Sequence, residues 1–248
     1  MKQNPLSHVY WCVVLIMYQG KRVCVVIPAW NEEEPIAHTV KDFMTPEVDA
    51  ILVIDNNSTD NTAKVAKSAG AIVIPETIQG YGAAIRRGLR EALNRGFDLI
   101  LITEADQTFR GIDVPRLLHQ IKNHHFVVGT RTATPYLEEG ANMGLFLVVG
   151  NIAVAKLLGL IHGYPALTDV GCTLRVIRRE MLEAILPLLN AEGAAFSPQM
   201  IVKVLQHGGK IKEIPVLYLT RVGEAKITTS KGKAFRNGLE MIKVILGL

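Results

Sequence analysis

The stretch Leu99–Arg110, LILITEADQTFR, decides how the rest of the chain is interpreted. Its first four residues are all apolar, which is typical of a buried strand in a parallel sheet. Glu104 and Asp106 follow, where ligands of open α/β sheets bind. Carboxylates there are costly to bury unless a cation neutralises them. The pair therefore predicts a site for Mg²⁺ or Mn²⁺ shared with a substrate phosphate, and an ordinary acidic turn is the alternative.

Length and composition limit the classes of protein to which this chain can belong. The chain has 248 residues, of which 49% are hydrophobic and 20% are charged, and this length can bury a full core. The net charge of +4 is modest, so we expect no nucleic-acid partner. Cys12, Cys24 and Cys172 lack the spacing of metal ligands and fit a reducing cytoplasm.

Two apolar segments raise the question of a membrane. Val9–Tyr18 is about ten residues long, whereas a membrane span needs roughly twenty. It also lacks the small-residue cleavage site of a signal peptide. Asn151 and Lys156 interrupt the longer stretch Met143–Leu160. We therefore expect a cytoplasmic protein in which Met143–Leu160 forms an amphipathic helix that attaches peripherally to the inner face of the membrane.

Strand and helix signals alternate through the first half of the chain. Asn31 is expected to cap the first helix, and Asp113 a later helix with Pro115 in its first turn. The alternation predicts an α/β fold with a mostly parallel central sheet and helices on both faces. The expected strands cover residues 22–28, 51–54, 71–75, 99–102 and 126–130, with helices around 63–68 and 80–95.

The second half is less regular, and its basic residues gather near the end. We expect residues 221–236 to form a basic loop and residues 237–246 a terminal helix. No linker or repeat divides the chain, so a leading segment, 1–21, is expected to precede one domain, 22–248. The other expected elements are an apolar helix to about residue 161, a loop entering a strand over 168–178, helices over 180–189 and 198–206, and a strand over 210–219.

Polar side chains follow several of these strands at the end where ligands bind. Carboxylates that can bind a metal, next to an arginine that can bind phosphate, are typical of a site for a nucleoside diphosphate. They fit a site built from a nucleophile and its base less well. The segment GYGAAIRRG at 80–88 fits neither the Walker nor the dinucleotide-binding motif. The residues are Pro28, Trp30, Asn31 and Glu32 after the first strand, Asp55 after the second, Glu104 and Asp106 after the central strand, and Arg131 after the next.

Several segments, in order along the chain, resemble the motifs of family 2 glycosyltransferases with the GT-A fold. Two later segments are similar to motifs of the dolichol- and polyprenyl-phosphate sugar transferases. The first group is VIPAWNEEEPI at 26–36, IDNNSTDNT at 54–62, GYGAAIRRG at 80–88, EADQTF at 104–109 and GTR at 129–131. The second is DVGCTLR at 169–175 and GEAK at 223–226, so the resemblance runs from about residue 22 to the C-terminus.

The resemblance implies a GT-A glycosyltransferase domain that transfers a sugar, with inversion, from a UDP- or GDP-sugar. A donor half, about 22–131, would bind the nucleotide-sugar, and an acceptor half, about 132–248, would bind a polyprenyl phosphate. Glu104 and Asp106 would hold Mg²⁺ or Mn²⁺. The implied nucleotide-sugar residues are Pro28, Trp30, Glu32, Asp55, Gly82, Ala105 and Arg131.

The implied catalytic residues are Asp106 and three residues of the acceptor half. Arg175 and Lys226, with Arg131, would orient an acceptor phosphate. Such an acceptor is already an anion and needs no strong base. An alcohol acceptor would need one, and Asp169 is the candidate.

The sequence departs from the family pattern at a few positions. Glu104 stands where the family has Asp, Asn56 and Asn57 stand where it has Asp and Gly, and Cys172 with Thr173 replaces Ser and Gly. The QxxRW signature of processive polysaccharide synthases is missing, which argues against polymerisation. Two alternatives stay open: transfer to a soluble or glycan hydroxyl, and a non-catalytic nucleotide-binding scaffold whose metal site Glu104 has weakened.

Overall fold

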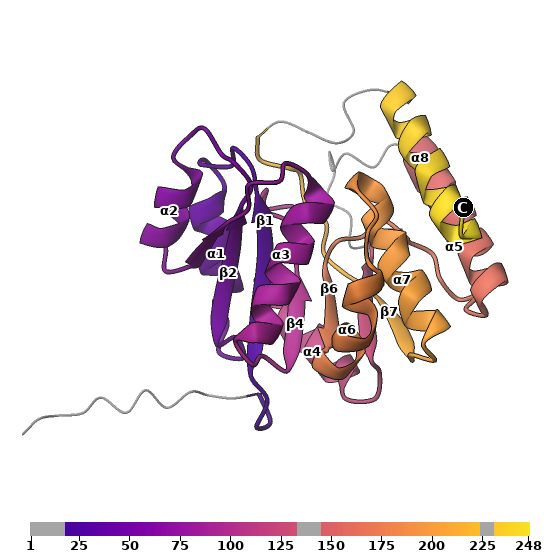
Figure 1. The fold of residues 1–248 in the computed structure, drawn as a ribbon, viewed down its shortest axis with the longest axis horizontal. Helices are drawn as coiled ribbons and strands as arrows, with labels where there is room; N and C mark the ends of the chain where they lie inside the picture. Colours follow the sequence, from indigo (N-terminus) through magenta and orange to yellow (C-terminus); the bar gives the residue numbers. More distant parts are fainter. Residues whose placement is uncertain (1–17, 133–144, 224–230) are drawn as a thin grey trace, which may run out of the picture.

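A mixed sheet runs through the centre of the molecule in a computed structural model, which describes residues 18–132, 145–223 and 231–248 (Figure 1). Within these residues the strand order is β3-β2-β1-β4-β6-β5-β7. All neighbouring strands are parallel except at β6, which is antiparallel to both of its neighbours. The strands are β1 (Val23–Ala29), β2 (Ala50–Asp55), β3 (Ile72–Pro75), β4 (Leu99–Ile102), β5 (Phe126–Thr130), β6 (Arg175–Arg178) and β7 (Ile211–Pro215).

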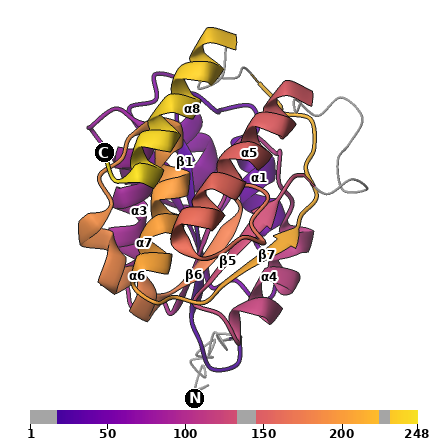
Figure 2. The same ribbon diagram turned by 90° about the vertical axis from the view of Figure 1, so that its right-hand side faces the viewer.

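Helices cover both faces of this sheet, which confirms the predicted α/β class (Figures 1 and 2). One face packs against α1 (Ile36–Phe43), α2 (Thr62–Ser68) and α4 (Val114–Ile121). The opposite face packs against α3 (Tyr81–Asn94), α5 (Leu145–His162), α6 (Arg179–Ile185), α7 (Phe196–Gln206) and α8 (Lys231–Leu246).

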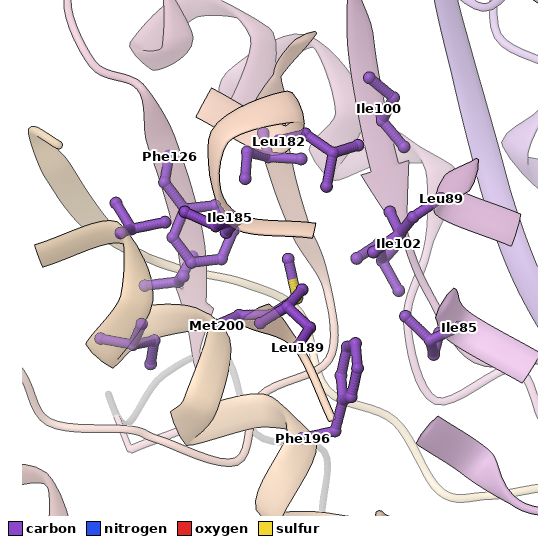
Figure 3. Close-up of a cluster of buried hydrophobic side chains, with 14 of the residues drawn as sticks. Ile85, Leu89, Ile100, Ile102, Phe126, Leu182, Ile185, Leu189, Phe196 and Met200 are labelled. Atoms are coloured by element: carbon purple, nitrogen blue, oxygen red, sulfur yellow. The ribbon is translucent and has the colours of Figure 1, made fainter. Parts of the chain in front are cut away.

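β4, which has helices on both of its faces, is apolar and buried at every position. Successive side chains of a strand point to opposite faces, so Leu101 joins the core on the α4 side and Ile102 the core on the α3 side. Figure 3 shows the second core, in which Ile102 lies near Ile85 of α3, and Phe196 projects from α7. This double burial explains why the apolar run in β4 is continuous rather than alternating.

The antiparallel β6 brings an additional loop to the functional edge of the sheet. Ile102, the last residue of β4, pairs with Arg175, the first residue of β6. The loop that precedes β6, residues 168–174, therefore lies where the parallel strands end. Because β7 is parallel to β5, the segment after it, residues 216–222, also starts from that edge.

Several expected boundaries are wrong. Asn31 does not cap the first helix, because α1 begins at Ile36 with Pro35 at its N-cap. Asn31 instead has a φ of 52°, in the left-handed region that Asn tolerates. Asp113 does occupy the N-cap of α4, but its side chain makes no capping bond. It pairs with Arg116 instead.

The other differences lie in the second half of the chain. The helix expected over 180–189 ends at Ile185, and a 3-10 turn that contains Pro187 follows. β7 stops at Pro215, because the chain then turns across the sheet edge and Leu219 N–H bonds Thr108 O. The terminal helix begins at Lys231, so part of the predicted basic loop is helical.

Helices α5 and α8 pack together at the end of the molecule opposite α2 (Figure 1). Exposed apolar side chains on α5 include Leu160, which is 80% exposed. No helix in the described ranges has the length and apolar character needed to cross a membrane. Met143 and residues 1–17 of the predicted leading segment lie outside the described residues.

Candidate active site

The loops after β1 and β2 are joined by side-chain hydrogen bonds. Asn31 N–H donates to Ser58 Oγ at 3.0 Å, and Thr59 N–H donates to Asn31 Oδ1 at 2.8 Å. Glu32 N–H donates to Thr62 Oγ1 at 2.8 Å. These bonds satisfy part of the backbone of the two loops, and they hold the loop that carries Trp30 and Glu32 against the loop after β2.

Asn56 organises the next loop. Its Nδ2 donates to the carbonyls of Glu76 and Ile78 at 3.0 and 2.7 Å, and its Oδ1 accepts from Gly80 N–H at 2.8 Å. A carboxylate at this position has no N–H to donate, whereas an amide supplies two donors and an acceptor. The departure at Asn56 therefore has a structural reason: it fixes the segment that leads into α3.

Gly82 lies in the first turn of α3, beside the loop between α6 and α7. A Cβ at this position would lie 2.4 Å from the carbonyl oxygen of Ala191. Arg86 Nη1 donates to the same carbonyl at 3.0 Å, and Arg86 also pairs with Glu192. Gly82 thus has a packing reason to be glycine.

Asp55 and Trp30 lie at the edge of the sheet where β2 and β1 end. Asp55 Oδ1 is buried and has no hydrogen-bond partner within the described part of the chain. Ala29, which pairs with Asp55, is followed by Trp30, whose side chain is 41% exposed. Pro28 is a partly buried residue within β1. A buried acceptor near an exposed aromatic ring can bind a flat, hydrogen-bonding ligand.

Glu104 and Asp106 place two carboxylates directly beyond β4. Burial of its carboxyl group, and then the neighbouring Asp106 carboxylate, raise the pKa of Glu104 to about 8. Asp106 is 2% exposed, and Thr108 donates to its Oδ1 through N–H and Oγ1 at 3.1 and 2.6 Å. Ala105, between them, is buried, and its carbonyl accepts from Thr39 Oγ1 at 2.8 Å.

This carboxylate pair fits a divalent cation. Two crowded carboxyl groups repel each other when both are charged, and a cation between them removes that repulsion. Their oxygens are the ligands that Mg²⁺ prefers, and Mg²⁺ commonly takes one or two carboxylates and completes its shell with water and phosphate. Within the described ranges no group of three or more His, Cys, Asp or Glu side chains is arranged to hold a metal.

Arg221 also belongs to this site, and the sequence analysis missed it. Its guanidinium lies 2.8 Å from Glu32 Oε1 and 3.1 Å from Asp106 Oδ2. The backbone supports this placement, because Val222 N–H donates to Asp106 O at 3.0 Å. In the sequence Arg221 is only the first of several basic residues, and no local pattern connects it with β4.

Arg131 and Asp169 form a buried ion pair at the ends of β5 and the loop before β6. Arg131 Nε lies 2.8 Å from Asp169 Oδ2, and Nη2 lies 2.9 Å from Oδ1. Asn151 of α5 adds a bond of 2.6 Å to the same carboxylate. Although burial alone would raise the pKa of Asp169, Arg131 and these hydrogen bonds lower it to about 2. Asp169 is therefore a weak base, and it holds Arg131 in place.

Arg175 is enclosed behind the site. It is 2% exposed, its Nη1 donates to Ser197 O at 3.0 Å, and its Nη2 donates to Cys172 O. Its Nε has no hydrogen-bond partner in the described part of the chain. Burial lowers the pKa of this guanidinium. Arg175 supports the loop before β6 and presents little surface to a ligand.

The predicted residues thus fall into three groups. The predicted residues after β1, β2 and β4 share one edge of the sheet. Arg131 adjoins this edge, because its charge interacts with that of Glu104. Asp169 and Arg175 adjoin that edge but are occupied by other protein groups. Lys226 lies outside the described residues.

Comparison with known proteins finds relatives that match most of the chain. The chain is 28% identical over 230 residues to a dolichyl-phosphate hexose transferase of Haloferax volcanii, covering 92% of this chain and 96% of that protein. It is 28% identical over 219 residues to an undecaprenyl-phosphate mannosyltransferase of Micrococcus luteus, covering 84% and 88%.

A solved structure shares the fold. Glucosyl-3-phosphoglycerate synthase from Mycobacterium tuberculosis, in complex with Mn²⁺, UDP and glucosyl-3-phosphoglycerate, superposes with a TM-score of 0.71 at 20% identity, over 92% of this chain and 80% of that one. The predicted GT-A-like fold is thereby confirmed. Residues 24–186 match the model of glycosyl transferase family 2. The chain therefore belongs to glycosyl transferase family 2 and is a glycosyltransferase.

Proposed function

We propose that this glycosyltransferase moves a sugar from a nucleotide-sugar to a polyprenyl phosphate, with a divalent metal ion and with inversion at the anomeric carbon. The carboxylate pair of Glu104 and Asp106 carries the proposal. It lies at the edge of the sheet where α/β proteins bind ligands, and its crowded charges favour a cation. The named relatives support the lipid phosphate as acceptor.

The donor is proposed to bind along the ends of β1, β2 and β4. Asp55 Oδ1 would accept an N–H of the base, and Trp30 would lie against its ring. Glu104 and Asp106 would hold Mg²⁺ or Mn²⁺ beside the diphosphate. The bound cation would offset the negative charge that develops on the leaving nucleoside diphosphate.

The acceptor side supports an anionic nucleophile. A phosphate monoester already carries the charge that attacks, so no strong base is required. The pKa of about 2 makes Asp169 a poor base, which fits such an acceptor better than an alcohol. We propose that Asp169 is a positioning residue that holds Arg131 toward the site, and that Arg131 and Lys226 contact the acceptor phosphate. Arg175 would act by supporting the loop before β6.

The lipid part of the acceptor needs an apolar surface near the site. Asn151 of α5 bonds the same carboxylate as Arg131, so α5 is directly linked to the proposed acceptor site. The exposed apolar side chains on this helix are Val149, Leu160 and Ile161. We propose that α5, together with α8, faces the membrane that holds the acceptor. Basic residues near an anionic surface each add about 1 kcal/mol to such binding.

A transfer assay tests the proposal. The purified chain is incubated with labelled UDP- or GDP-sugars, with and without Mn²⁺, and with either a polyprenyl phosphate, the corresponding polyprenol, or a soluble sugar. We expect product with the polyprenyl phosphate and Mn²⁺. Product with polyprenol or the soluble sugar, at a rate equal to that with the phosphate, would contradict the acceptor class.

Two variants separate donor binding from acceptor binding. Asp55→Ala should weaken nucleotide-sugar binding measured by calorimetry, because the base loses a buried acceptor. Lys226→Ala should leave that affinity nearly unchanged while the transfer rate falls. If Lys226→Ala lost donor affinity to the same degree as rate, Lys226 would belong to the donor site instead.

A further inference from the structure

Arg221 joins two carboxylates that lie at the metal end of the donor site. Its Nη2 contacts Glu32 and its Nη1 contacts Asp106, at 2.8 and 3.1 Å. The two acidic side chains are only 8% and 3% exposed, whereas Arg221 is 19% exposed. Carboxylates buried to this degree are costly unless a cation is next to them. In this structure that cation is the guanidinium of Arg221.

The position of Arg221 conflicts with a metal ion on the same carboxylate. Thr108 already occupies Asp106 Oδ1 through its N–H and hydroxyl, so Oδ2 is the oxygen oriented toward other ligands. Arg221 contacts that oxygen. A divalent cation bound there would lie a few ångströms from the guanidinium, and two cations at such a distance repel each other strongly in a poorly hydrated site.

The backbone of the segment that carries Arg221 is bonded to the loop after β4 on both sides of this residue. Leu219 N–H donates to Thr108 O at 2.9 Å, and Val222 N–H donates to Asp106 O at 3.0 Å. The side chain of Arg221 is long and has a buried Nε with no hydrogen-bond partner in the described ranges. The guanidinium can therefore leave Asp106 while the backbone of the segment stays in place.

We propose that Arg221 is the resident counter-ion of Asp106 and that a divalent cation binds by displacing it. The proposal rests on the proposed function, which places the metal at Glu104 and Asp106. Its consequence is that Arg221 lowers the affinity of the free protein for the cation. It also offsets part of the negative charge of Asp106 and Glu32 when no metal is bound.

Calorimetry with Mn²⁺ and the full chain tests this competition. We expect Arg221→Gln to bind Mn²⁺ about tenfold more tightly than the wild type, within the usual range of coupling between competing or linked sites. Arg221→Lys should fall between them, because it keeps the charge but cannot bridge two carboxylates. Arg95→Gln is the matched control: it removes the same charge from a surface pair with Glu91, and Mn²⁺ affinity should not change.

Thermal unfolding gives a second readout that does not depend on activity. Without metal, Arg221→Gln should melt below the wild type, because Asp106 and Glu32 lose a cation. Addition of Mn²⁺ should raise the melting temperature of the variant by more than that of the wild type.

The outcomes distinguish the two proposals. Equal or weaker Mn²⁺ binding by Arg221→Gln, with wild-type binding that Asp106→Asn abolishes, overturns the competition and leaves the metal site standing. Mn²⁺ binding to neither the wild type nor Arg221→Gln overturns the metal site itself. If Arg221→Gln does not fold, Arg221→Lys provides the test. An Mn²⁺ affinity of Arg221→Lys no higher than that of the wild type would overturn the competition.

Discussion

Charged side chains in two regions of the molecule, the end of β2 and the loop before β6, differ in whether protein groups already bind them. In the donor half, neutral side chains such as Asn31 and Asn56 hold the loops, and Asp55 keeps a buried oxygen without a hydrogen-bond partner in the described part of the chain. Arg131, where the two halves meet, is paired with Asp169 of the acceptor half, and Arg175 is bound to backbone carbonyls. Asp55 thus offers a ligand an unpartnered acceptor, whereas these two arginines already have protein partners.

This difference indicates how each half acts. A preformed acceptor such as Asp55 Oδ1 can bind a base without rearrangement of the loops. A paired arginine can only add its charge to a ligand that approaches from its open side, or exchange partners as we propose for Arg221. Variants should therefore differ in kind: changes at Asp55 and Asp106 should affect ligand binding and rate, whereas changes at the Arg131–Asp169 pair should first affect stability.

The largest expected effect comes from Asp106→Asn. The amide keeps the shape of the side chain but not the charge that a hard cation needs. We expect transfer to fall by about a thousandfold. Initial rates at saturating Mn²⁺ measure this, and circular dichroism checks that the fold is retained. Full activity would mean that Asp106 does not hold the metal.

Asp169→Asn should lower the free energy of unfolding of the protein. The variant leaves Arg131 buried without its carboxylate, which typically costs about 3–5 kcal/mol. Urea denaturation measures the change in the free energy of unfolding. Glu183→Gln is the matched control, because it removes a surface pair with Arg179 and should cost less than about 1 kcal/mol. Equal effects of the two variants would refute the buried pair.

The same pair predicts a loss of stability in acid. The pKa of Asp169 is about 2 in the folded protein against 3.8 for the free side chain, so the unfolded chain binds its proton first as pH falls. The contribution is complete above pH 3.8 and is lost toward pH 2. It amounts to about 2 kcal/mol. Unfolding curves at several pH values measure it, and in Asp169→Asn this part of the pH dependence should be missing.

Gly82→Ala tests the packing of the donor half against the acceptor half. The new methyl group would clash with the carbonyl oxygen of Ala191, and overpacking of this kind costs about 1–2 kcal/mol. Gly150→Ala is a control in a helix, because a Cβ there has no neighbour within 4 Å. A Gly82→Ala protein with unchanged melting temperature would show that the loop at Ala191 adapts freely.

The smallest effect is expected from Glu104→Asp. It restores the residue that the family motif has at this position and shortens the side chain by one methylene. If that geometry suits the cation better, Mn²⁺ affinity and transfer should be retained or should rise. A clear loss of both would show that the surroundings of Glu104 have adapted to the longer side chain.

Local sequence patterns were enough to predict the parts of the fold that depend on neighbouring residues. Continuous apolar runs predicted β1, β2, β4 and β5, because a strand buried on both faces needs apolar side chains at every position. The alternation with helices predicted the parallel part of the sheet. That in turn placed Asp55, Glu104 and Asp106 at one edge, because parallel strands end on the same side.

Which charged groups meet depends on the three-dimensional arrangement of the strands and loops. The antiparallel β6 enters between β4 and β5, and its loop brings Asp169 to Arg131. The segment after β7 brings Arg221 to Asp106. No periodicity links residues so far apart in the chain, and their pairing depends on strand order and on the partners that burial requires. The motifs therefore indicated a site at this edge, and the fold determined which of its charges are already neutralised.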